Sequence, residues 1–168
     1  MGFPAMAMVL AILAASPVAP SANTETPSPF DGYWRTPLPC NWPGRDSAEV
    51  QKCLQDPPGF DLQLWSTGAR LCGIHEAEYI TLEDATTGME EAPTITGAIA
   101  TGIMTVKFHS TLGGRGEATM RLLDGKLHWD VVRQDDGRSA LPLHAVLTKQ
   151  SNILPLGNPP VCSAQSPL

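Results

Sequence analysis

The chain has 168 residues, enough for about one domain, and carries 11 basic and 17 acidic side chains, a formal net charge of −6. Such an acidic chain argues against nonspecific binding to nucleic acids or anionic membranes, which requires a basic surface. Only 17% of its residues are charged, whereas it holds 15 glycines and 16 prolines. This composition is typical of turn-rich all-β proteins and argues against helical bundles.

Residues 1–22 have the features of a secretory signal peptide. Residues 5–15 (AMAMVLAILAA) form an uncharged apolar run, well short of the ~20 residues that a membrane-spanning helix needs. We expect cleavage near Ser21 or Ala22, and the Pro/Ser/Thr-rich residues 23–31 to form a linker. The alternative is that the apolar run is a buried segment of the domain. The sequence predicts export, to the periplasm or the medium.

Four cysteines in an exported chain predict two disulfides. Three connectivities are possible, and we expect Cys40–Cys53 with Cys72–Cys162. The first pair closes a short loop, which contributes about 3 kcal/mol by restricting the unfolded chain. The second attaches the Pro-rich tail, residues 151–168, to the domain. A zinc site is the competing interpretation, but C-x-x-C spacing is missing, and we expect no metal and no cofactor.

One short helix is predicted after Cys40. Asp46 or Ser47 can cap its N-terminus, and Glu49 completes a D-x-x-E capping box with Asp46. The prolines of residues 56–58 end it. All the elements that follow are predicted to be strands.

Residues 117–130 give the strongest hairpin, with Asp124-Gly125 as a two-residue type I′ turn. This register separates the side chains into two faces. The core face holds Ala118, Met120, Leu122, Leu127, Trp129 and Val131, and the solvent face holds Thr119, Arg121, His128 and Asp130.

A second hairpin pairs residues 94–100 with 103–110 about Thr101-Gly102. Alternation again separates two faces, and Ile95, Gly97, Ile99, Met104, Val106 and Phe108 share the inner one.

A third hairpin pairs residues 60–65 with 70–75 about Thr67-Gly68. We expect Trp65 to lie opposite Arg70 on the outer face as a cation–π pair. The inner face is expected to hold Phe60, Leu62, Leu64 and Leu71.

Further strands at residues 32–38, 78–83 and 141–149 bring the total to about nine, mostly in up-and-down order. Closure removes both exposed edges of such a sheet. Residues 32–150 are therefore predicted to form an all-β domain, an antiparallel up-and-down barrel of eight or nine strands with one short N-terminal helix. A two-sheet β-sandwich is the alternative.

Gly32-Tyr33-Trp34 opens the first strand, and Lys149 ends the last one. This arrangement resembles the G-x-W opening of calycin-like barrels, the lipocalins and avidin-type proteins, in which the Trp closes one end under a basic side chain. The L-x-L-x-x-x-G-x-x-L-C-G run of residues 62–73 is similar to that of uncharacterised exported bacterial proteins. The barrel resemblance implies a binding scaffold with loops at its mouth, and no particular ligand.

No enzyme is predicted. The histidines (His75, His109, His128 and His144) lack metal-ligand spacing, and no G-x-S-x-G motif is present. Residues 75–78 are expected to be a solvated strand edge, and the pairs Glu83-Asp84, Glu90-Glu91 and Asp135-Asp136 to be solvated loops. A hydrolase that uses two carboxylates from distant strands stays open.

The most distinctive loop is residues 110–116 (STLGGRG). It joins two strands, so it is not a phosphate-binding loop, which lies between a strand and a helix. One interpretation is a flexible hairpin connection. The other is a protruding finger in which Ser110, Leu112 and Arg115 enter the cleft of a partner.

The leading hypothesis is an exported, disulfide-bonded binding protein that inhibits a cell-wall lytic enzyme of the lysozyme type. An acidic inhibitor suits a basic extracytoplasmic partner. The first alternative is a calycin-like carrier of a small apolar ligand, but the inward residues Phe60, Phe108, Met120 and Trp129 are large and predict a filled interior. The second alternative is a structural module of the cell envelope.

Overall fold

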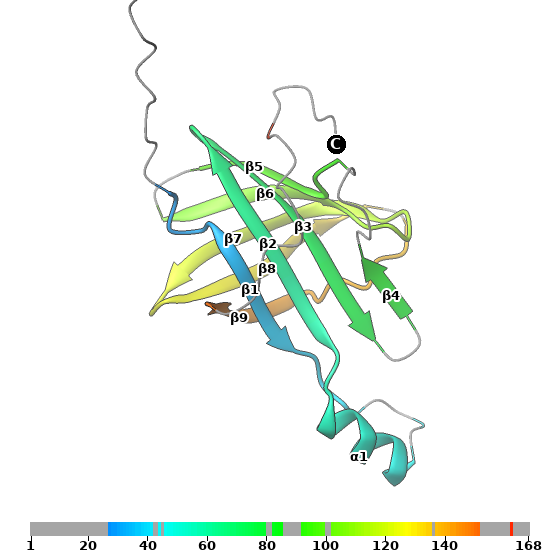
Figure 1. Ribbon diagram of the computed structural model, residues 1–168. Coiled ribbons are helices and arrows are strands. Elements are labelled where there is room, and N and C mark those ends of the chain that lie inside the picture. The colour runs from blue at the N-terminus through cyan, green and yellow to red at the C-terminus, as the bar shows by residue number, and fades with distance from the viewer. Residues whose placement is uncertain are drawn as a thin grey trace, which may run out of the picture.

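The computed structural model describes residues 27–41, 44, 46–79, 82–85, 92–99, 102–135, 137–151 and 162. That part of the chain folds into one helix and nine strands (Figure 1). In chain order they are β1 (Gly32–Pro37), α1 (Ser47–Gln55), β2 (Gly59–Thr67), β3 (Arg70–Tyr79), β4 (Leu82–Ala85), β5 (Ile95–Ala98), β6 (Ile103–His109), β7 (Arg115–Leu123), β8 (Lys126–Gln134) and β9 (His144–Gln150).

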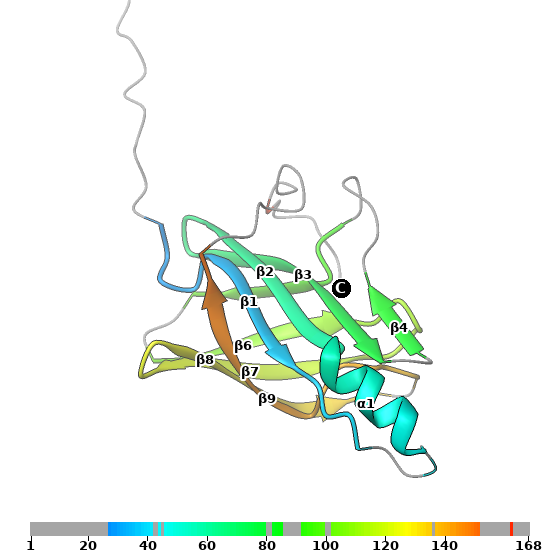
Figure 2. The same ribbon diagram turned by 60° about the horizontal axis from the view of Figure 1, so that its bottom comes forward.

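The strands form one sheet that closes on itself. Their order is β2-β1-β9-β8-β7-β6-β5-β3-β4, and β2 also pairs with β3. All pairings between these strands are antiparallel. Eight strands therefore make a closed up-and-down barrel, and β4 is an extra strand on β3 (Figure 2). The predicted barrel is confirmed, and the sandwich is not adopted.

Two hairpins have the registers predicted from their alternation. In β7–β8, Met120 pairs with Trp129, and the turn residues Asp124 and Gly125 have φ values of 50° and 74°. Positive φ at both positions is the requirement of a type I′ turn. In β5–β6, Ile95 pairs with Phe108, while Thr101 of the expected Thr101-Gly102 turn lies outside the described residues.

The β2–β3 hairpin differs from its predicted register by two residues. Trp65 lies opposite Cys72, so the expected pairing with Arg70 is wrong. The turn is Gly68-Ala69, because Gly68 has a φ of 59° and occupies the first turn position, where a type II′ turn favours glycine. A shift of two residues preserves the faces. The inner side chains are still Phe60, Leu62, Leu64 and Leu71, all of them buried.

The single strand expected at residues 78–83 is also wrong. β3 continues to Tyr79, and β4 runs back along it, with Glu78 opposite Glu83. Only residues 80 and 81 separate the two strands, and they are Ile and Thr, residue types that mark no turn in a sequence.

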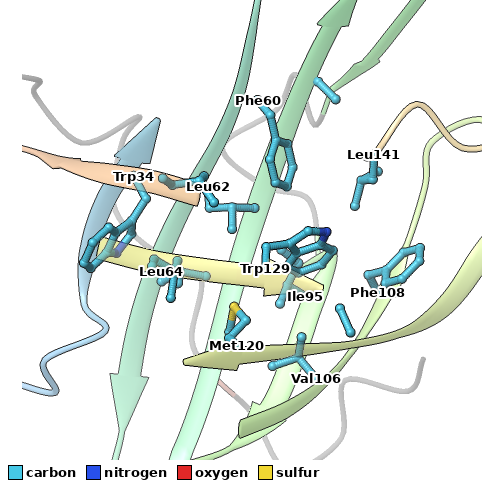
Figure 3. Packing of buried hydrophobic residues seen from close by; sticks show 14 of the residues in the cluster. Trp34, Phe60, Leu62, Leu64, Ile95, Val106, Phe108, Met120, Trp129 and Leu141 are labelled. Carbon is cyan, nitrogen blue, oxygen red and sulfur yellow. The ribbon is translucent and has the colours of Figure 1, made fainter. Parts of the chain in front are cut away.

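Large side chains fill the barrel (Figure 3). The indole of Trp129 lies between Phe60 and Phe108, with ring centroids 5.6 and 5.7 Å away. Other inward side chains from the eight barrel strands surround these rings: Trp34, Leu62, Leu64, Leu71, Ile95, Met104, Met120, Leu127 and Leu147. The interior is therefore a packed hydrophobic core.

The helix has the caps that the sequence predicts. The Glu49 backbone N–H donates to Asp46 Oδ1 at 2.9 Å, and the Asp46 N–H donates to the Glu49 carboxylate at 3.3 Å. Cys53 is the buried residue of α1, and its disulfide to Cys40 fastens the helix to the chain after β1.

The second disulfide joins Cys72 on the outer face of β3 to Cys162, 90 residues further along the chain. Both pairings are those expected from the sequence. Disulfides of this kind are typical of exported proteins. The described residues include no helix that is long and apolar enough to cross a membrane. The expected signal peptide lies outside them.

Candidate functional site

A buried carboxylate connects the loops at one end of the barrel. β5 pairs with the first half of β3 and β4 with the second half, so β4 lies at the end of the barrel that also carries α1 (Figure 2). Asp84 on β4 has a side chain with no exposure to solvent. Its contacts reach the β6–β7 and β8–β9 connections, which are far away in the sequence.

The Asp84 carboxylate accepts five hydrogen bonds. Oδ2 receives the Ser110 hydroxyl at 2.6 Å and the Ala140 backbone N–H at 3.0 Å. Oδ1 receives the backbone N–H of Thr111 at 2.8 Å, the Thr111 hydroxyl at 2.9 Å and His75 Nε2 at 3.1 Å. Hydrogen bonds to an ionised acceptor are stronger than neutral ones, so one side chain holds two loops against β3.

His75 extends this network to the segment just before β5. An ionised carboxylate can only accept, so Nε2 carries the proton that it donates to Asp84. Nδ1 lies 2.8 Å from the hydroxyl of Thr94, just before β5. All three residues are buried. The line of hydroxyl, imidazole and carboxylate is thus closed to solvent, and its contacts are those of a structural anchor.

The electrostatics of Asp84 favour its ionised form. Burial by itself would raise the pKa of this carboxyl, but the hydrogen bonds from His75, Ser110 and the Ala140 N–H outweigh burial and hold the pKa well below its ordinary value. Asp84 is therefore a permanent anion at neutral pH, and the two loops are bound to a fixed negative charge.

The loops are also bonded to each other. Ser110 N–H donates to the Gly114 carbonyl at 2.7 Å, and Gly113 N–H donates back to the Ser110 carbonyl at 3.0 Å. Gly114 N–H then donates to the Arg138 carbonyl at 2.8 Å, which joins the β6–β7 connection to the β8–β9 connection. We call residues 110–115 and 137–141 the anchored loops. Hydrogen bonds thus hold the backbone of the two loops in place.

The sequence singled out Ser110, Leu112 and Arg115 as residues that contact a partner. In the structure these three residues differ in their exposure to solvent. Ser110 is buried against Asp84, and Leu112 is half-buried on the core. Arg115 is exposed at the start of β7. Hydrogen bonds from Ser110 and Thr111 to Asp84 hold one end of this glycine-containing connection. Contact of these residues with a partner stays a prediction.

Sequence reasoning missed the anchor itself. Asp84 was expected in a solvated loop and His75 on a solvated edge; both expectations are wrong, because both side chains are buried. His75 had a detectable signal, since it lies at an inward position of β3 two residues from Gly73 and two from Ala77. Asp84 had none, because Ser110 and Ala140, which it holds in the two loops, are 26 and 56 residues away.

The structure brings Trp34 and Lys149 together at the opposite end. They pair across β1 and β9, and Lys149 Nζ lies 5.4 Å from the centroid of the Trp34 ring. Trp34 Nε1 donates to the Phe30 carbonyl at 2.8 Å. Phe30 falls within the expected linker, yet it is buried in the core, so the barrel begins a few residues before β1.

A second polar cluster lies on the outer face of β1 and β2. Arg35 Nη1 donates to Asp61 Oδ2 at 3.0 Å. Burial raises the pKa of Asp61 above its ordinary value, and the negative charge of Glu78 acts in the same direction. Interactions with Tyr33 and Arg35 oppose this rise only in part. The site therefore disfavours the charge that Asp61 carries at neutral pH.

Asp61→Asn is expected to raise the free energy of unfolding at pH 7. The pKa of Asp61 in the folded chain exceeds the unfolded value of about 3.9. Ionised Asp61 therefore lowers the free energy of unfolding at any pH above the folded pKa, and this cost vanishes below the unfolded pKa. Urea unfolding of both proteins at pH 7 and pH 3 checks this, with a gain expected at pH 7 alone. A lower stability at pH 7 would mean that the Arg35 contact outweighs burial.

Within the described ranges, no three His, Cys, Asp or Glu side chains gather in a way that could hold a metal ion. No protein-family model matches the chain, and neither a curated protein nor a solved structure matches it significantly. The barrel resemblance therefore rests on Gly32-Tyr33-Trp34 and Lys149 together with the architecture. The anchored loops are the candidate functional site on their geometry alone.

Proposed function

We propose that the chain is an exported binding protein that recognises another protein through its anchored loops, and that this partner is a cell-wall lytic enzyme of the lysozyme type. The observation that carries the proposal is the Asp84 network, which fixes two loops at one end of a rigid barrel. A loop that is ordered before binding loses less conformational entropy in the complex. Tight inhibitors commonly exploit such pre-organisation.

The filled interior supports recognition at the surface. A carrier of a small apolar ligand needs a cavity of roughly 300 Å³ or more. Here Trp129 occupies the middle of the barrel, in contact with both Phe60 and Phe108. The carrier alternative would require this aromatic cluster to move apart, so the proposal assigns binding to the outside of the barrel.

The distribution of charge also supports the proposal. Residues 1–101 carry 12 acidic and 4 basic side chains, a net −8, whereas residues 102–151 carry 5 acidic and 7 basic ones, a net +2. The body of the protein is thus acidic and suits a basic enzyme, while the anchored loops come from the basic part. Charge complementarity of this kind speeds encounter and selects partners.

The test is a panel of purified wall-degrading enzymes with the oxidised mature protein. We expect stoichiometric inhibition of at least one lysozyme-type glycosidase, and a complex that co-elutes in size exclusion at low salt. Native mass spectrometry of the purified protein checks the alternative. No inhibition together with a bound apolar small molecule would replace this proposal with the carrier function.

A further inference from the structure

Two arginines stand on backbone segments of the anchored loops that contact each other. Arg115 directly follows Gly114, whose N–H donates to the Arg138 carbonyl at 2.8 Å. A bridge between Gly113 and Arg138 continues the contact. Both arginine side chains are exposed, so two guanidinium groups project from backbone segments that touch. We call these two residues the arginine pair.

Among the described residues, no acidic side chain forms an ion pair with either guanidinium. Asp135 is an acidic neighbour among the described residues, since its N–H donates to the Arg115 carbonyl at 2.8 Å. Its carboxylate, however, bonds to Arg133, which also binds Glu117. The arginine pair is thus a cationic point on a protein of net charge −6.

The chemistry of a guanidinium indicates what this point recognises. Its planar fork matches the two oxygens of a carboxylate, and two neighbouring forks match two carboxylates. Most glycoside hydrolases carry two catalytic carboxylates about 5 to 9.5 Å apart on either side of the bond that they cleave. A basic lysozyme-type enzyme therefore presents an acidic centre within a basic surface. This protein presents the opposite, a cationic point on an acidic body.

We infer that the arginine pair binds the catalytic carboxylates of its target, so that the target is a two-carboxylate wall glycosidase and not a metal-dependent amidase or peptidase. This inference rests on the proposed function and gives it a partner class. The Asp84 network places the pair, because it fixes both loops on which the arginines stand.

The experiment measures dissociation constants for the most strongly inhibited glycosidase of the panel. Arg115→Gln and Arg138→Gln are each expected to weaken binding at least about tenfold, because each removes charge-assisted hydrogen bonds. Arg121→Gln is the matched control, an exposed arginine near the C-terminal end of β7, and is expected to change the constant by less than about twofold. The second arm changes the enzyme. Replacing a catalytic carboxylate by its amide is expected to remove most of the effect of Arg115→Gln, which a double-mutant cycle measures.

The outcomes separate the two proposals. If the wild type inhibits a glycosidase and both glutamine variants bind as well as Arg121→Gln, the arginine pair is not the recognition element, although the proposed function stands. Inhibition of only a metal-dependent amidase or peptidase would overturn the inference and the lysozyme-type partner, and leave an inhibitor of another class. Absence of any inhibition would overturn the proposed function and the inference with it. Thermal melts check that the exposed substitutions leave the fold intact, and Arg115→Lys, which keeps the charge without the fork, gives a second reading.

Discussion

Replacing Asp84 by alanine is expected to lower the free energy of unfolding by about 3–5 kcal/mol, the usual loss when one partner of a buried charged network is removed. The substitution leaves the donors on Ser110, Thr111, Ala140 and His75 without their acceptor inside the barrel. Asp84→Asn is expected to lose less, about 2 kcal/mol, because one carbonyl oxygen remains to accept. Urea unfolding measures both losses.

Hydrogen exchange separates the anchor from the rest of the barrel. In Asp84→Asn the backbone amides of Thr111 and Ala140 are expected to exchange much faster, while core amides of β7 and β8 change only with global stability. Asp130→Asn is the matched control, since Asp130 pairs with His144 at an exposed site. That variant is expected to lose at most about 1 kcal/mol. Unchanged exchange at both amides in Asp84→Asn would show that the loops do not depend on the carboxylate.

The same carboxylate gives the protein a defined acid sensitivity. The pKa of Asp84 is lower in the folded chain than the value of about 3.9 that it has when unfolded. Its ionisation therefore contributes stability that is fully present above the unfolded pKa and is lost as pH falls toward the folded one. The difference in unfolding free energy between wild type and Asp84→Asn is expected to be constant above about pH 5 and to shrink below about pH 4. A difference that grows on acidification would contradict the assigned charge.

Removal of the Cys72–Cys162 disulfide has the other large expected effect. The crosslink spans 90 residues, and the chain entropy that it removes from the unfolded state amounts to about 4–5 kcal/mol, against about 3 kcal/mol for the 13-residue separation of Cys40 and Cys53. The double variants Cys72→Ala/Cys162→Ala and Cys40→Ala/Cys53→Ala compare the two directly, because each leaves the other crosslink in place. Thermal and urea unfolding under oxidising conditions give both values.

A larger loss of unfolding free energy in Cys40→Ala/Cys53→Ala than in Cys72→Ala/Cys162→Ala would mean that the disulfides act mainly on the folded state. Cys53 is the buried side chain of α1, so its substitution also removes a packing contact of the helix. If Cys40→Ala/Cys53→Ala proves the more costly pair, α1 depends on its disulfide for order. Circular dichroism of that variant shows whether the helical signal is lost with it.

Local patterns predicted the parts of the fold that local forces determine. The β7–β8 hairpin combines strict alternation with Asp124-Gly125, a pair suited to positive φ at both turn positions, and one register satisfies both conditions. In β2–β3 the glycine of Thr67-Gly68-Ala69 fits either position of a two-residue turn, and alternation does not distinguish registers two residues apart. The faces were therefore predictable there, and the partner of Trp65 was not.

The candidate site was predictable only in part, because local sequence patterns do not show contacts between distant segments. Gly113 and Gly114 mark a loop, and Arg115 follows them, so the sequence shows that a charged loop exists there. Its rigidity comes from Asp84, which belongs to another strand and looks like one half of an ordinary acidic pair. The alternation of polar and apolar residues along β4 does not show that the Asp84 side chain is buried and bonds to residues of two distant connections.

The closure of the barrel by β1 and β9 has a consequence for how the protein is made. Synthesis proceeds from the N-terminus, so among the described strands β1 is made first and its neighbour β9 last. Until β9 is made, β1 has one unpaired edge, and the Trp34 ring lacks its contact with Lys149. Folding must end with the pairing of sequence-distant strands, which is the slow step of β topologies and the one most open to aggregation. The nascent chain therefore needs protection over its whole length, and truncation within β9 is expected to leave an unclosed, insoluble sheet.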